Sequence, residues 1–463
     1  MAKKLVFGPT FEEMLNPEKI KKDIRAKAIE AKKKKDALNP INLYNITWVD
    51  EKNRPYYFVL PKQLTGVKPN IVILYGKEFP TGSHKVGATY SCAIEKQVHR
   101  EIEPGVHKLV WPSTGNYGIG GAYVGPRMGY ASIVILPELM SKERFELIKW
   151  YGADYIKTPG CESNVKEIYD KAEELAEKDK KIRVLNQFAE FGNYRFHYYV
   201  TGNTILHVVK ELKEQGIGNG RVAAFVSAMG SGGTIAAGER IKQEFYEAKT
   251  IGLEPIQCPT IFLNGFGGHD IQGIGDKHVT WIHNVMMMDA IMCIDDIECK
   301  RGLQLLSEPG GMEYLRKELG IPKQTVEFMS TVFGISGICN IIGAIKTAKY
   351  YEMDEDDVIF TIATDSIDRY YSVLADMRKN YGKIDRASAR AVHETVFNPK
   401  LDWIEEATFQ RRKRWFNLKY YTWVEQRGKT VEELVETRKP EFWLKQQKMV
   451  EEIDEKIVEM RGF

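Results

Sequence analysis

The sequence predicts an α/β fold with mostly parallel sheets, and two observations support this prediction. From about residue 71 to residue 364, short runs rich in β-branched and aromatic residues alternate with segments of helical period. Glycine-rich loops follow several of these runs, at strand-to-helix junctions where ligands bind in such folds. The chain has 463 residues, 43% of them hydrophobic, which is enough for two or three structural units.

Six apolar runs are predicted as strands because each is short and bounded by turn residues. They cover residues 71–76, 108–113, 131–137, 221–228, 250–255 and 358–364. Residues 141–153 and 337–353 show helical period between them. Two flanks differ from this pattern: a charged, helix-prone segment opens the chain, and the residues after about 370 are rich in charge and aromatics.

Composition and charge favour a small-molecule partner and a reducing compartment. The 66 basic and 63 acidic residues leave a net charge of +3, so no global field attracts nucleic acid or an anionic membrane. The cysteines lack Cys-x-x-Cys spacing, and no metal site is predicted. The first 15 residues lack the pattern of a signal peptide, and we expect a cytoplasmic protein. The six cysteines are Cys92, Cys161, Cys258, Cys293, Cys299 and Cys339.

One basic run, "QRRKRW" at residues 410–415, interleaves charge with an aromatic residue as nucleic-acid-binding segments do. Glu405, Glu406 and Glu425 lie nearby, so an amphipathic helix or an interface is the favoured interpretation.

The loop "MGSGGTIAAGERIKQE" directly follows a predicted strand. Gly230, Gly232 and Gly233 allow close backbone approach, while Ser231 and Thr234 add hydroxyls at the start of a helix. Exposed N–H groups at a helix N-terminus form a phosphate cradle. The alternative is a tight βα turn without a ligand.

Three further glycine-rich loops occupy similar positions. "STGNYGIGGA" offers Ser113, Thr114, Gly115 and Asn116 as donors to a carboxylate, with an Asx-type N-cap as the alternative. The other two loops are residues 264–278 and residues 332–340. Ser336, in the last loop, could contact a ligand or could simply cap the helix that follows.

Lys85 lies between the turn "PTGS" and a predicted helix, which is an unusual setting for a solvated lysine. Together with the loops it describes a site for a phosphate, a carboxylate and one amine. Pyridoxal 5'-phosphate, a phosphorylated carbonyl cofactor that forms a Schiff base with lysine, fits this inventory.

Seven motifs, in order and spacing, resemble the fold-type II pyridoxal-phosphate enzymes over about residues 70–365. The similarity is closest to the cysteine synthase (O-acetylserine sulfhydrylase) and cystathionine β-synthase branch. The motifs are "EFPTGSHKVGA", "STGNYGIGGA", "MSKERFELIKWYGADYIKTPG", "LNQFAEFGNYRFHYYVTGNTI", "SAMGSGGTIAAGERIK", "GLEPIQCPTIFLNGFGGHDIQGIGD" and "GISGICNIIGAI".

This resemblance implies a tryptophan synthase β-like architecture: two α/β subdomains with mostly parallel sheets and the cofactor in the cleft between them. Residues 63–370 would form the catalytic core, with the smaller subdomain, about 95–205, inserted in the larger. Residues 1–62 would be an N-terminal extension and residues 371–463 a C-terminal helical extension that covers the active-site mouth or builds an interface. The resemblance also implies a homodimer.

The resemblance implies roles for individual residues. Lys85 would form the Schiff base, Asn116 would hydrogen-bond the ring oxygen, and Ser336 would face the pyridine nitrogen. The residues that would bind the phosphate are Gly230, Ser231, Gly232, Gly233 and Thr234. The residues that would bind or line the substrate are Ser113, Thr114, Gly115, Tyr117, Gln187, Gly273 and Gly275.

The activity that the resemblance implies is β-replacement on an activated L-serine, such as O-acetyl-L-serine, by a sulfur nucleophile through an aminoacrylate intermediate. A β-eliminating lyase acting on cysteine, serine or cysteate shares every residue named above. A further alternative is a weakly active cofactor-binding subunit of a complex.

The chain departs from the family pattern at two positions near the site. Val86 and Gly87 follow the lysine where cysteine synthases have Asp-Arg. Tyr117 replaces the second threonine of the carboxylate loop, so we expect a pocket of different shape. Of the histidines in these motifs, His84 is expected to pack near the phosphate and His269 to stabilise its loop.

Overall fold

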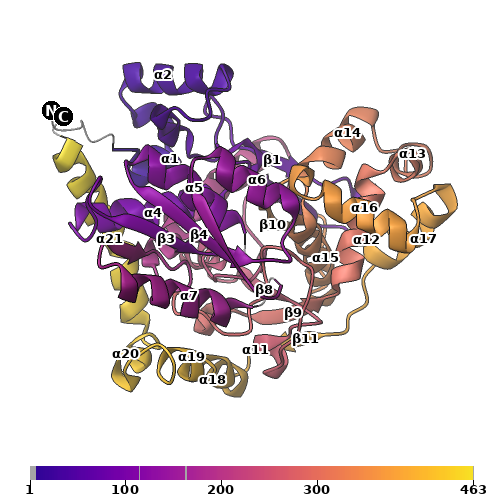
Figure 1. The fold of residues 1–463 in the computed structure, drawn as a ribbon. Helices are drawn as coiled ribbons and strands as arrows, with labels where there is room; N and C mark the ends of the chain where they lie inside the picture. Colours follow the sequence, from indigo (N-terminus) through magenta and orange to yellow (C-terminus); the bar gives the residue numbers. More distant parts are fainter. Residues whose placement is uncertain (1–6, 114, 162–163, 462–463) are drawn as a thin grey trace.

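Two sheets form the frame of the molecule in the computed structural model, which describes residues 7–113, 115–161 and 164–461 (Figure 1). The larger sheet has the order β1-β2-β10-β7-β8-β9-β11 and the smaller the order β5-β4-β3-β6. The smaller sheet is parallel throughout, as are the five inner strands of the larger one. Strands β1 and β11 pair antiparallel at the two edges. The predicted α/β class is confirmed.

All six predicted strands are present, within three residues of the predicted ends. They are β2 (Asn70–Tyr75), β3 (Lys108–Pro112), β4 (Ala131–Pro137), β7 (Ala224–Ala228), β8 (Lys249–Pro255) and β10 (Val358–Ala363). Five strands were not predicted: β1 (Tyr57–Val59), β5 (Asp154–Thr158), β6 (Ile182–Val184), β9 (Ala290–Ile294) and β11 (Ile404–Glu406).

The inner strands are apolar because helices cover both faces of a parallel sheet. Every residue of β10 is buried, and its Phe360 pairs with Val72 on one side and Phe225 on the other. An unbroken apolar run of this kind is what the sequence shows between residues 358 and 363.

Helices connect and flank the strands. In the first half of the chain they are α1 (Phe11–Leu15), α2 (Lys22–Lys33), α3 (Lys62–Thr65), α4 (Lys85–Val98), α5 (Asn116–Arg127), α6 (Lys142–Trp150), α7 (Val165–Lys178), α8 (Phe191–Arg195), α9 (Gly202–Glu214) and α10 (Ala237–Glu244). Later helices of the core are α11 (Thr260–Leu263), α12 (Asp296–Ser307), α13 (Pro309–Lys317), α14 (Lys323–Val332) and α15 (Ile335–Tyr350).

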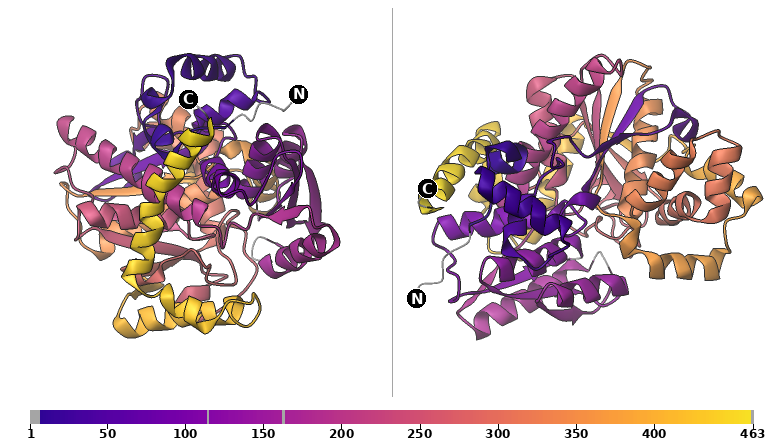
Figure 2. Two further views of the ribbon diagram at one scale, coloured as in Figure 1. Left: turned by 90° about the vertical axis from the view of Figure 1, so that its left-hand side faces the viewer. Right: turned by 90° about the horizontal axis from the view of Figure 1, so that it is seen from above.

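The residues after 370 add six helices and strand β11. These helices are α16 (Tyr371–Tyr381), α17 (Arg386–Val396), α18 (Phe409–Asn417), α19 (Lys419–Trp423), α20 (Val431–Glu436) and α21 (Pro440–Arg461). Figure 2 shows α21 crossing one face of the molecule, with α18–α20 below it. The boundaries at residues 62 and 370 stay a prediction.

The basic run at residues 410–415 lies in α18 and is engaged within the chain. The indole of Trp415 is fully buried and donates to Glu405 at 2.8 Å. Arg411 and Arg414 form ion pairs with the same carboxylate, and Arg412 donates to the backbone oxygen of Met288. The predicted amphipathic helix is confirmed.

No single helix in the described part of the chain is both long and apolar enough to cross a membrane. Helices α14 and α15 reach that length only as a pair bent by 118°.

Candidate active site

The turn that carries Lys85 follows the carboxyl end of β2 and a short 3-10 helix, Gly76–Glu78. A side chain at Gly76 would lie 2.6 Å from the backbone oxygen of Thr364, which follows β10, so two neighbouring strand ends meet here. The guanidinium of Arg369 donates to the backbone oxygen of Thr81 within the turn. The turn is therefore fixed between β2 and the segment after β10, and Lys85 begins α4.

The amine of Lys85 is buried and points at the predicted phosphate loop. Its Nζ donates to the hydroxyl of Ser231 at 3.4 Å. Burial lowers the pKa of Lys85 to about 8, and the nearby carboxylate of Asp276 opposes that shift. A lysine with a lowered pKa is partly neutral near physiological pH, which is the form that attacks a carbonyl.

The loop Gly230–Thr234 connects β7 to a 3-10 helix and α10. Gly232 has φ +75°, and a side chain there would lie 2.6 Å from the Cβ of His283. A side chain at Gly233 would lie 2.1 Å from the amide oxygen of Asn193. Glycine is thus required at two successive positions, as a loop that presents backbone N–H groups to an anion requires.

Asn193 and His84 hold this loop from outside. The amide of Asn193 donates to the Ser231 hydroxyl and to the backbone oxygen of Gln187, both at 2.9 Å. His84 Nε2 lies 3.4 Å from the hydroxyl of Thr234, so His84 packs beside the loop as predicted. Burial lowers the pKa of His84 well below its ordinary value.

The loop after β3 belongs to the smaller sheet. Ser113 is buried, and its hydroxyl accepts from the backbone N–H groups of Gly115 and Gly118 at 2.9 and 2.8 Å. Gly115 has φ +156°, where a side chain would collide with Arg144. The ring of Tyr117 packs edge-on against Trp111, with centroids 5.8 Å apart. Thr114 lies outside the described residues.

Asn116 joins the two sheets. Its amide nitrogen donates to the carboxylate of Asp365, which follows β10 of the larger sheet, at 2.7 Å. Its Oδ1 is buried and has no hydrogen-bond partner among the residues that the structure describes. The Asx-type cap is not formed, because the side chain reaches Asp365 instead of its own helix.

Ser336 lies in the first turn of α15 and is fully buried. The helix is preceded by Gly334 at the N-cap position, and the Ser336 hydroxyl has no partner within the described chain. The capping role considered for Ser336 is wrong, because its oxygen accepts no backbone N–H.

The loop after β8 closes the site on the remaining side. A side chain at Gly230 would lie 3.0 Å from the backbone oxygen of Gly273, which has φ +102°. Gly275 has φ +81° and donates its N–H to the oxygen of Met229 at 2.8 Å. His269 contacts the oxygen of Gly275 at 2.7 Å, as its predicted loop-stabilising role requires.

Two acidic residues of the site were missed by sequence analysis. Asp276, directly after the "IQGIG" loop, has both carboxylate oxygens buried without a partner in the described chain, and burial raises its pKa to about 7. Asp365 is fully buried between Arg144 and Arg369, 3.8 and 3.7 Å away, and accepts from the hydroxyl of Tyr370 at 2.9 Å. Their positions in the sequence could have indicated them, because Asp276 directly follows a glycine-rich loop and Asp365 follows the predicted strand β10.

This geometry defines a class of protein: an α/β protein with a buried, partly neutral lysine beside an anion cradle, and with buried polar groups that lack partners in the described chain on loops of both sheets. Residues 64–312, more than half of the chain, match the family model "Pyridoxal-phosphate dependent enzyme". The chain belongs to this family, and its cofactor is pyridoxal 5'-phosphate.

Curated relatives agree with the branch that the motifs predicted. A probable cysteine synthase of Bacillus subtilis is 29% identical over 294 residues, covering 63% of this chain and 85% of the relative. The cystathionine β-synthase of Saccharomyces cerevisiae is 28% identical over 338 residues, which cover 69% of this chain and 61% of the relative.

Solved structures agree as well. O-acetyl serine sulfhydrylase isoform 3 of Entamoeba histolytica has a TM-score of 0.59 at 25% identity, covering 73% of this chain and 92% of that one. A hydrogen sulfide-producing enzyme of Fusobacterium nucleatum has a TM-score of 0.57 with the same identity and coverage. The predicted cysteine synthase branch is confirmed.

Proposed function

We propose that this protein catalyses β-replacement on an activated L-serine, such as O-acetyl-L-serine, by a sulfur nucleophile. The observation that supports it most directly is the contact between the Lys85 amine and Ser231 of the anion cradle. When bound, the cofactor would supply an electron sink that acidifies the Cα proton of the substrate.

The residues around Lys85 fit this cofactor. The cradle Gly230–Thr234 would hold its phosphate, and Lys85 would bind its aldehyde carbon. The buried Ser336 hydroxyl lacks a partner in the described chain, as a group that donates to a ring nitrogen would. The amide nitrogen of Asn116 donates one N–H to Asp365, and its second N–H would donate to the ring oxygen. Displaced by substrate, the Lys85 amine is the base for the Cα proton.

The substrate carboxylate would lie against the N–H groups of the loop after β3. Ser113 fixes that loop by accepting from Gly115 and Gly118, and Gln187 is held through Asn193. Gly273 and Gly275 would leave room for the substrate side chain. The role of Thr114 and the effect of Tyr117 on the pocket stay proposals.

A second candidate is β-elimination from cysteine or serine, and Asp276 favours it. Acetate leaves without a proton, whereas a thiol or hydroxyl group leaves more easily when an acid protonates it. Asp276 is buried close enough to interact with Lys85, and its pKa of about 7 keeps part of the population protonated at neutral pH.

The test is product analysis with purified protein, O-acetyl-L-serine and sulfide. Cysteine as the main product supports replacement, and pyruvate formed despite excess sulfide contradicts it and supports elimination. No turnover of O-acetyl-L-serine, cysteine or serine would support a cofactor-binding subunit instead. Lys85→Ala should lose the visible absorption of lysine-bound cofactor and at least about 10³-fold activity, whereas Lys77→Ala, in the 3-10 helix before the turn, should keep both.

The assembly and location remain proposals. We infer a homodimer from the family resemblance, which sedimentation would test. We infer a cytoplasmic location because five cysteines are buried thiols that form no disulfide with one another, as in a reducing compartment. They are Cys92, Cys258, Cys293, Cys299 and Cys339. Fractionation of the source cells would test it.

A further inference from the structure

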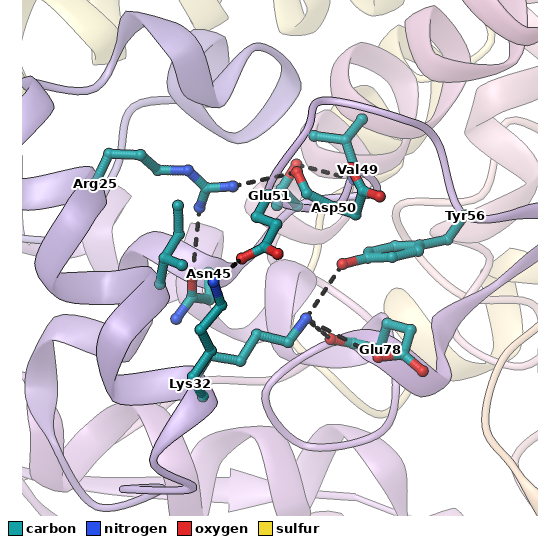
Figure 3. Close-up of a pocket in the computed structure, with 11 residues that line it drawn as sticks. Arg25, Lys32, Asn45, Val49, Asp50, Glu51, Tyr56 and Glu78 are labelled. Carbon is teal, nitrogen blue, oxygen red and sulfur yellow. Dashed lines mark hydrogen bonds and ion pairs between the residues drawn. The ribbon is translucent and has the colours of Figure 1, made fainter.

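A second cavity lies outside the candidate active site, between α2, the segment 45–56 and the start of the turn that leads to Lys85 (Figure 3). Its volume is about 380 Å³, within the range of small-molecule sites. All but one of its lining residues precede residue 64, where the family match begins. The exception is Glu78.

Arg25 is the first unusual group of this cavity. Its guanidinium makes only long hydrogen bonds, and all of them go to neutral oxygens: the backbone oxygens of Tyr44 and Asp50 and the amide oxygen of Asn45, at 3.3 to 3.4 Å. The carboxylate of Asp50 is turned to Arg54 instead, at 2.6 Å. A half-buried guanidinium with no carboxylate partner in the described chain is a site that an anion completes.

Lys32, on the same helix, reaches the cavity beside it. Its ammonium donates to the hydroxyl of Tyr56 at 3.2 Å and to the backbone oxygen of Glu78 at 3.0 Å, and the Glu78 carboxylate is 4.0 Å away. Burial lowers the pKa of Lys32; the Glu78 carboxylate opposes this shift, and the positive charge of Arg25 adds to it. Arg25 and Lys32 therefore share the cavity. Among the described residues Arg25 hydrogen-bonds to no carboxylate, and Lys32 has only that of Glu78, at 4.0 Å.

Three carboxylates also line the cavity, those of Asp50, Glu51 and Glu78. They attract Arg25 and Lys32, but within the described chain none of them accepts a hydrogen bond from either side chain. Glu51 is ion-paired with Lys33 at 2.7 Å. Ile29 and Val49 give the cavity an apolar wall. Figure 3 shows the Arg25 and Lys32 side chains extending from one helix toward the opposite segment that carries Asp50 and Tyr56.

We propose that this cavity binds a small anion, a carboxylate or phosphate group held jointly by Arg25 and Lys32, with the apolar part of the ligand against Ile29 and Val49. The site is separate from the one that holds the cofactor and stands whether or not the proposed reaction is correct. It adjoins the catalytic turn, because Lys32 donates to Glu78 and the turn to Lys85 begins at that residue.

Equilibrium dialysis of the cofactor-loaded protein against labelled inorganic phosphate and, separately, labelled acetate tests this proposal. The bound cofactor already fills the cradle Gly230–Thr234, so phosphate retained by the protein reports the second cavity. We expect one phosphate or one acetate per chain with saturation. Saturation by phosphate alone assigns a phosphate ligand. Because the loop after β3 is proposed to bind a carboxylate, saturation by acetate assigns a carboxylate ligand to this cavity only where Arg25→Gln weakens it. Saturation by both on these terms assigns either group.

The variants Lys32→Gln and Arg25→Gln should each raise the dissociation constant at least tenfold. Lys34→Gln is the matched control, since Lys34 lies two residues further on, exposed, and pairs with Glu30. Absence of saturable binding of both anions up to about 10 mM overturns the proposal, as does equal weakening by Lys34→Gln and Lys32→Gln. Circular dichroism of the variants confirms that they fold.

Discussion

Lys85 and Asp276 are two buried ionisable groups whose pKa values lie close together, at about 8 and about 7. Burial disfavours the charged form of both, and each charge stabilises the other. Ordinary lysine and aspartate residues titrate more than six pH units apart, so folding has brought an acid and a base into the same range. Such a pair suits proton transfer near neutral pH.

Replacing Asp276 by Asn should separate its role from the binding of cofactor. We expect kcat/KM for elimination from cysteine or serine to fall by roughly 10²-fold and its pH profile to lose the ionisation near pH 7, because the amide cannot exchange a proton. The visible absorption of bound cofactor should remain. Asp270→Asn, in the same loop but paired with Lys300, should keep the wild-type profile. An unchanged profile in Asp276→Asn would show that Asp276 takes no part in proton transfer.

Lys419 is a second buried lysine, far along the chain. Its ammonium donates to the oxygen of Trp281 at 2.9 Å, and burial lowers its pKa to about 7. Between about pH 7 and pH 10.5 the unfolded chain binds a proton here that the native state does not. The free energy of unfolding contributed by this group therefore rises with pH over that interval.

Lys419→Met should remove this contribution. We expect the stability of the variant, relative to wild type, to decline steadily as pH rises from about 7 to about 10, as measured by denaturant unfolding. Lys413→Met, at an exposed position of α18, should show no such trend. A constant difference between Lys419→Met and wild type would contradict a lowered pKa.

At the scale of elements, the strands that the sequence predicted are the apolar runs of the sheet interiors. The sequence does not predict β5 because residues on both faces of this strand are partly exposed, so it is not an apolar run. It does not predict β1, β6 and β11 because each has three residues, too few to show an alternation of apolar and polar side chains. Strand β9 lies inside a long apolar window that resembles a helix as much as a strand. Short edge strands depend on their neighbours, which a single sequence does not display.

In the candidate site, too, features that depend on local sequence could be predicted and features that depend on distant segments could not. Lys85, the glycine loop at 230–234 and Asn116 could be predicted because their residue types and spacing are local. Asp276 and Asp365 could not, because the burial of a carboxylate and its neighbours arise from packing between segments far apart in the chain. The bond between Asn116 and Asp365 joins residues 249 positions apart.

Helix α21 is tied to α1 at the other end of the chain through Asp454. Its carboxylate accepts from the backbone N–H groups of Phe11 and Glu12, at 2.7 and 2.9 Å, and so completes the N-terminus of α1. Asp454→Ala should lower the free energy of unfolding by about 1–2 kcal/mol near pH 4. The loss should shrink as the pH rises toward 7, because burial raises the pKa of Asp454 to about 7 and ionisation of the buried carboxyl costs stability. Denaturant unfolding measures it. Glu455→Ala, exposed on the same helix, should change little, and equal losses would show that the cap is not the cause.

At the scale of the whole molecule, helix α21 contacts both the N-terminal segment and the region of α4, the helix that begins with Lys85. Arg461 of α21 forms a bidentate ion pair with Glu13 of α1. Arg195 donates to Gln446 of α21 and to the buried Glu95 of α4, each at 2.6 Å. The hydroxyl of Tyr90 in α4 donates to the backbone oxygen of Pro9 at 2.7 Å, so the segments at both ends of the described chain contact α4.

Deletion of residues 440–463 should release the N-terminal segment before it affects the sheets. We expect residues 7–20 to lose hydrogen-exchange protection, because α1 loses the cap from Asp454 and the ion pair with Arg461. The face of α4 at Glu95 should become exposed, while exchange in β7, β8 and β10 stays slow. Mass spectrometry of exchanged peptides measures both regions.

The control is a variant that combines Glu451→Gln, Glu455→Gln and Glu459→Gln, on the exposed face of α21. Unchanged protection of residues 7–20 in the truncated chain would mean that the N-terminal segment is held by the core alone.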